Sequence, residues 1–181
     1  TLWVSGHHAA ILKYGDLLPD TLIKSDPDFC LYYAWILIIT GQILKAEPFL
    51  SQAEIRTREA LQYQNPSEAS IGICKKRLGK ICVAFAFMYA VLSQKDKVHA
   101  YSRPAMELLS EEDPLWYAWA LYTSGIDAMF RDDFSTSISA FKTGLVYAKR
   151  TGNIYLLSTI GSRVSAIEAR MGLYASSYRD C

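Results

Sequence analysis

The sequence has almost no signature of β-structure. It contains no Asn-Gly or Asp-Gly hairpin dipeptide, and no long alternation of apolar and polar residues bounded by turn residues. It also lacks any Gly/Ser-rich or charged tract that would separate two domains. These absences exclude a sheet-based architecture and favour one all-α domain.

Long apolar runs and an excess of one charge are missing as well. The longest apolar stretches, Leu31–Ile39 and Ile81–Leu92, are shorter than the roughly 20 residues that a helix needs to cross a bilayer. Lys plus Arg number 19 and Asp plus Glu number 18, so the net charge is +1. Without a basic stripe that could follow phosphates, we expect this segment to contact neither nucleic acid nor membrane.

The cysteines lack the spacing of a metal-binding or redox-active motif. No pair among the four has the two-residue gap of a zinc knuckle or a redox motif. The four are Cys30, Cys74, Cys82 and Cys181. Because three of them sit among apolar residues, we expect reduced, buried thiols and a cytoplasmic location.

Patterns typical of catalysis are absent too. His7 and His8 would point about 100° apart on a helix and cannot chelate one ion together, and His99 is expected to be an ordinary surface histidine. The acidic groups at 111–113 and 132–133 fall at helix starts or turns, where carboxylates cap helices. With no nucleophile elbow and no nucleotide loop, we expect no catalytic residue, no metal, no cofactor and no enzyme activity.

What the chain does contain is helix signals. Asn65-Pro66-Ser67-Glu68 matches a capping box with Pro at the first helical position, and predicts a helix from there to about Gln94. Asp113-Pro114 and Asp133 predict the starts of two further helices. Left-handed helix ends are expected at Gly152 and Gly172. Short linkers join roughly eight or nine helices in all, which forces neighbours to lie antiparallel.

A turn-and-helix segment recurs along the chain. In each copy a Gly or Asp at the turn is followed by an apolar residue within two positions and a small residue five positions later, where two helices cross closely. The copies are Gly41–Ala46, Asp132–Ser137 and Gly172–Ser177. This pattern predicts a single tetratricopeptide-like solenoid (an α-α superhelix) over residues 1–181, with hairpins at roughly 1–26, 28–64, 66–109, 114–151 and 154–181.

The third copy fits best and the second fits worst. Gly125 and Ser137 are the expected small residues of the third hairpin, with Phe134, Phe141 and Gly144 following at helical spacing. In the second hairpin, either Val98 or Ala100 suits the crossing position. Pro104 is expected to kink or shorten its helix.

An ordered set of short motifs resembles a known family. The motifs are Leu18–Leu22, Ser25–Leu31, Ala34-Trp35, Gly41, Ala46-Glu47, Ala53-Glu54, Glu111–Leu115, Gly152–Leu156 and Met171-Gly172. Their order and spacing are similar to the helical-repeat sensor region of the large ATP-dependent LuxR-type transcriptional regulators, the group that includes the maltose-regulon activator. The second hairpin departs from that pattern because it lacks the turn glycine.

The resemblance implies a fragment of a longer bacterial regulator. Such proteins have a nucleotide-binding switch domain before this region and a helix-turn-helix after it, and the repeat region binds an inducer or a regulatory protein and helps control self-association. We therefore expect a non-catalytic regulatory binding module. The alternatives are a generic tetratricopeptide scaffold, a self-assembly module and, if a convergent polar site exists, a helical enzyme.

The candidate binding residues lie on two helices. On a helix that begins at Pro114, five residues share one face, which would line the concave groove of a tetratricopeptide array. They are Trp116, Trp119, Tyr122, Ile126 and Met129. The corresponding face of the next first helix offers Thr159, Ser162 and Arg163. These residues form either the core between repeats or a platform for a polar effector or peptide, and Arg163 is either a ligand-binding cation or a solvated one.

Overall fold

The chain folds as a succession of α-helices in the computed structural model, which describes residues 8–62 and 67–172. Within those ranges there are nine helices and no strand, which confirms the predicted all-α class. They are α1 (His8–Leu17), α2 (Asp20–Ile23), α3 (Pro27–Ile39), α4 (Ile43–Gln62), α5 (Glu68–Val91), α6 (Lys95–Leu108), α7 (Pro114–Phe130), α8 (Phe134–Thr151) and α9 (Ile154–Arg170). None of the described helices is both long and apolar enough to cross a membrane.

Most helix ends in the structure lie where the sequence predicts them. Asp113 accepts a hydrogen bond from the amide of Trp116 at 3.4 Å, and Asp133 accepts one from Thr136 at 3.0 Å. Gly152 and Gly172 both have left-handed φ angles, +65° and +74°. Side-chain acceptors and glycine thus satisfy backbone groups that a helix leaves without partners.

The start of α5 differs from the prediction. Asn65 and Pro66 lie outside the described residues, and α5 begins at Glu68 with Ser67 as its N-cap. The Ser67 hydroxyl accepts from the amide of Ser70 at 3.2 Å. The helix also ends at Val91 rather than near Gln94, because the chain turns at Ser93.

One turn geometry joins the two helices of each complete hairpin. A residue with positive φ, namely Gly41, Ser93 or Asp132, follows the first helix, and the second helix begins two residues later. The amide after each turn residue bonds back to a carbonyl five residues earlier, at 2.7, 2.9 and 3.0 Å respectively. The second hairpin therefore makes the same turn as the others, with serine in the place of glycine.

The second helices share one buried stripe. Its positions are spaced four, three and four residues apart, and begin five residues after the turn residue. They are Ala46, Leu50, Ala53 and Thr57 in α4, then Val98, Ser102, Ala105 and Leu109 in or just after α6, then Ser137, Phe141, Gly144 and Ala148 in α8. Val98 is buried and Ala100 is exposed, which places Val98 at the crossing. Helix α6 runs on through Pro104 to Leu108, so the expected shortening does not occur.

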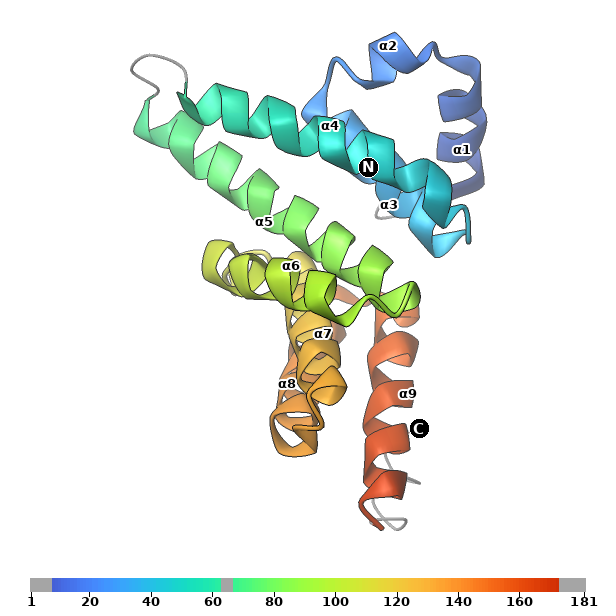
Figure 1. Cartoon of the computed structure of the whole chain (residues 1–181), viewed down its shortest axis with the longest axis vertical. Helices are drawn as coiled ribbons and strands as arrows, with labels where there is room; N and C mark the ends of the chain where they lie inside the picture. Colours follow the sequence, from blue (N-terminus) through green and yellow to red (C-terminus); the bar gives the residue numbers. More distant parts are fainter. Residues whose placement is uncertain (1–7, 63–66, 173–181) are drawn as a thin grey trace.

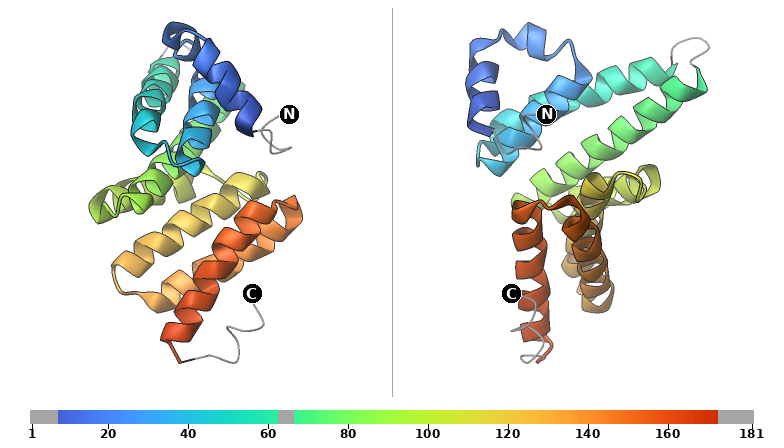
Figure 2. Two further views of the ribbon diagram at one scale, coloured as in Figure 1. Left: turned by 90° about the vertical axis from the view of Figure 1, so that its right-hand side faces the viewer. Right: turned by 180° about the vertical axis from the view of Figure 1, so that it is seen from behind.

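The hairpins α3–α4, α5–α6 and α7–α8 follow one another along the long axis, from α1 and α2 at one end to α9 at the other (Figure 1, Figure 2). Each first helix packs against its own second helix, and α5 also packs against both α3 and α7. Of the first predicted hairpin (1–26), the described residues form α1 and the single turn α2, and α1 packs on α3.

Aromatic rings connect the first helices through the core. Trp35 of α3 lies 5.4 Å from Phe87 of α5 and 4.9 Å from Trp119 of α7, measured between ring centroids. Phe87 and Trp119 are 5.1 Å apart, and Trp119 reaches Tyr155 of α9 at 6.0 Å. These contacts set the spacing of the four first helices, three of which (α5, α7 and α9) line the site described next.

Candidate ligand-binding site

Trp116 and Trp119 do not form a groove wall. Each is 1% exposed, and their rings lie 5.2 and 4.9 Å from the ring of Trp35. The interpretation of these two as a ligand platform is corrected: aromatic side chains of α3 and α5 cover the two tryptophans, which therefore pack in the core between hairpins.

The C-terminal part of this face of α7 does border a cavity. Tyr122, Ile126 and Met129 of α7, together with Arg163 of α9, line a pocket of about 180 Å³. Four of the eight predicted residues are thereby brought together. Tyr122 and Ile126 are each only 3% exposed and Met129 is half-buried, so these three present a packed, largely apolar wall.

Thr159 and Ser162 stand apart from this pocket. On α9, Thr159 is half-buried and Ser162 is exposed. The Thr159 hydroxyl donates to the carbonyl of Tyr155 at 2.7 Å, and the Ser162 hydroxyl donates to the carbonyl of Thr159 at 3.0 Å. Hydroxyls that bond the preceding turn of their helix are not directed at a ligand.

The third wall of the pocket comes from the end of α5 and was not predicted. It consists of Phe87, Ala90, Val91 and Ser93, with Phe130 completing the rim. Phe87 and Ile126 occupy equivalent positions, each six residues before the turn residue of its hairpin. The signal that would have found this wall is the hairpin register, which the missing turn glycine at position 93 concealed.

Arg163 and Tyr122 supply the polar chemistry of the pocket. The Arg163 Nε donates to the Tyr122 hydroxyl at 3.4 Å, a long contact that leaves the guanidinium's other donors available. Among the described residues Arg163 has no carboxylate partner, and the side chain is exposed at the mouth. A cation beside a phenol at the edge of an apolar recess suits a small ligand with one carboxylate or carbonyl group.

Acid–base groups lie elsewhere. Asp127, 6% exposed on α7, is bound by His99 at 3.1 Å and by Arg131 at 2.8 Å. His99 is exposed on the surface of α6, as expected, and α6 also brings its ring against this buried carboxylate. Neither Asp127 nor His99 lines the pocket, and no cluster of His, Cys, Asp or Glu within the described ranges has the arrangement of a metal site.

The cysteines contribute no reactive group to the site. Cys30, Cys74 and Cys82 are buried and free, while Cys181 lies outside the described residues. Burial raises the pKa of Cys82 to about 12 and that of Cys30 to about 11, so both thiols are protonated and poor nucleophiles at neutral pH.

Comparisons with models of known protein families, with curated proteins and with solved structures gave no match. The case for function therefore rests on the pocket and on the sequence motifs.

Proposed function

We propose that this chain is a non-catalytic regulatory module that binds a small effector, or one side chain of a partner protein, in the pocket between α5, α7 and α9. The observation that carries the proposal is Arg163, a cation without a carboxylate partner among the described residues, which lies beside the Tyr122 hydroxyl at the mouth of an apolar recess.

The size of the pocket limits the ligand. A volume of about 180 Å³ is below the roughly 300–1,000 Å³ of drug-sized sites, so the ligand is a small molecule or a single amino-acid side chain. Its apolar part packs between Phe87, Ile126 and Met129, and its carboxylate or carbonyl oxygen accepts from Arg163. Sugars, short carboxylates and amino acids are the classes to test.

The position of the pocket supplies a regulatory mechanism. Its walls come from the α5–α6 hairpin, the α7–α8 hairpin and α9, so one ligand contacts three successive units. A ligand that touches several packed units stabilises the arrangement in which its contacts are best made. Binding in this way would bias a larger protein between two states without any chemical step.

The setting of a bacterial transcriptional regulator rests on the motifs that resemble LuxR-type sensor regions, among them Leu18-Pro19, Ala34-Trp35 and Gly152-Asn153. Reading the gene on both sides of this segment tests that setting. The setting fails if the intact protein has neither a nucleotide-binding domain upstream nor a helix-turn-helix downstream.

Ligand binding itself is tested by thermal shift with sugars, amino acids and short carboxylates. We expect at least one class to raise the Tm, and the shift to be lost in Arg163→Met and in Ala90→Phe, which fills the pocket. Lys149→Met, an exposed change at the end of α8, is the matched control. If no compound raises the Tm while pull-down recovers a stable protein partner, the chain is an interaction scaffold instead.

A further inference from the structure

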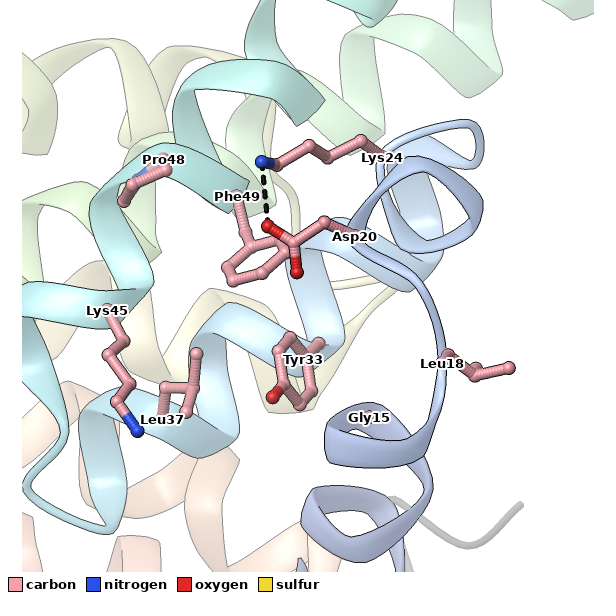
Figure 3. Close-up of a pocket in the computed structure, with 9 residues that line it drawn as sticks. All are labelled: Gly15, Leu18, Asp20, Lys24, Tyr33, Leu37, Lys45, Pro48 and Phe49. Atoms are coloured by element: carbon pink, nitrogen blue, oxygen red, sulfur yellow. Dashed lines mark hydrogen bonds and ion pairs between the residues drawn. The ribbon is translucent and has the colours of Figure 1, made fainter.

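A second and larger pocket lies at the other end of the molecule. It has a volume of about 380 Å³, within the range of small-molecule sites, and is bordered by α1, α2, α3 and α4. Its lining residues are Gly15, Leu18, Asp20, Lys24, Tyr33, Leu37, Lys45, Pro48 and Phe49 (Figure 3). It shares no residue with the pocket near Arg163.

The course of α1 and α2 leaves this space open beside the α3–α4 hairpin. Gly15 of α1 sits against the ring of Tyr33, where an added Cβ would overlap the ring, so α1 touches α3 at this point. The Leu18-Pro19 break then ends α1, and α2 carries the chain across the open side of the α3–α4 hairpin (Figure 1). Because α1 contacts α3 at one point and the chain then diverges from it, a pocket remains between these helices instead of a packed interface.

The floor of the pocket is aromatic. Phe49 of α4 and Tyr33 of α3 meet edge to face, with ring centroids 5.0 Å apart, and Leu37 and Pro48 extend the apolar surface. Figure 3 shows the two rings at the centre of the pocket, with Lys24 and Lys45 on opposite sides of them. Tyr33 is 5% and Phe49 8% exposed, so only a small part of each ring borders the open space. Contact of a ligand ring with these parts would add to the gain from apolar burial.

The two lysines are not equivalent. Lys24 is neutralised by Asp20, with Nζ 3.0 Å from the carboxylate, and lies 5.5 Å from the centroid of the Phe49 ring. Lys45 donates to the neutral amide oxygen of Gln42 at 3.0 Å, and among the described residues it has no carboxylate partner. Among the side chains that the structure describes, Lys45 is therefore the one cation of the pocket without a carboxylate partner.

We propose that this pocket is a second ligand site, which binds a small aromatic carboxylate with its ring against the exposed parts of Phe49 and Tyr33 and its carboxylate on Lys45. The inference is independent of the proposed function, since it concerns different helices and different residues.

The test compares 2-naphthoate with its neutral analogue 2-naphthamide by isothermal titration calorimetry on the 181-residue chain. We expect the carboxylate to bind about fivefold more tightly than the amide, as one partly exposed ion pair allows. Lys45→Met should equalise the two affinities by weakening only the carboxylate. Lys75→Met, an exposed change on α5 outside the pocket, should preserve the preference.

Arg163→Met separates this site from the other pocket. Retention of the preference for naphthoate in Arg163→Met, with its loss in Lys45→Met, supports the second site even if no effector is found for the first. The inference is overturned if naphthoate does not bind, if both probes bind the unmodified chain equally, or if the preference survives in Lys45→Met.

Discussion

Gly125 is the residue on which the packing of the α7–α8 hairpin depends most directly. A Cβ at this position would lie 2.6 Å from the ring of Phe141, which is fully buried. The Ser137 hydroxyl donates to the Gly125 carbonyl at 2.8 Å from the opposing helix. The sequence pattern predicted both small residues, because helices that cross this closely admit little else.

We expect Gly125→Ala to lower the free energy of unfolding by about 1–3 kcal/mol, the usual cost of overfilling a packed site. Gly72 is the matched control, since it lies in α5 with open space where its Cβ would be. Gly72→Ala should instead stabilise by about 0.5–1 kcal/mol by favouring the helix. Urea unfolding of both variants measures the difference, and equal effects would contradict the assigned crossing.

Cys82 makes stability depend on pH in the alkaline range. Burial raises its pKa from 9.0 to about 12, so between these values the folded chain holds a proton that the unfolded chain releases. Its contribution to stability is complete below pH 9 and is lost as the pH rises towards 12, by at most about 1.4 kcal/mol per pH unit. Unfolding of the unmodified chain and of Cys82→Ala from pH 8 to 11 should give converging curves. Parallel curves would contradict the burial of the thiol.

At the scale of the element, the common hairpin turn is the clearest feature. Caps such as Asp113-Pro114 and Asp133 were predictable because a short polar side chain before a helix has a direct physical role. The turn at Ser93 was not, because nothing in its composition distinguishes a left-handed serine from a helical one. Only the backbone geometry, with positive φ at Ser93 as at Gly41 and Asp132, shows that the three turns are equivalent.

Ser93→Gly should therefore stabilise the chain. A non-glycine residue at φ +56° costs about 1–2 kcal/mol relative to the right-handed conformation, and glycine relieves most of that strain. Gly41→Ala should have the opposite sign, because Gly41 has φ +84°. Thermal unfolding of both variants gives the comparison. A loss of stability in Ser93→Gly would contradict this prediction, because it would mean that the contacts of the serine side chain outweigh the backbone strain at this position.

At the scale of the whole molecule, the aromatic contacts from Trp35 to Tyr155 decide what is core and what is surface. Sequence periodicity placed Trp116 and Trp119 on one face of α7, but it could not show that α3 and α5 cover that face. It therefore left the core and the groove readings open. Tyr122, Ile126 and Met129 border the pocket because α5 ends nearby at Val91. The position of the pocket therefore depends on where α5 ends, and no pattern within α7 could predict that end.

The central claim is that the pocket at Arg163 binds a small ligand, and the methionine methyl groups of the chain test it directly. Met129 lines the pocket, whereas Met88, Met106 and Met171 do not and serve as internal controls. In ¹³C-methyl NMR of the 181-residue chain, the ligand found by thermal shift should move the Met129 signal saturably and leave the other three nearly unchanged. The Met129 response should disappear in Arg163→Leu, which removes the cation without adding a methionine methyl group. A ligand that shifts the Tm but leaves Met129 unmoved, or that moves it equally in Arg163→Leu, would contradict the account.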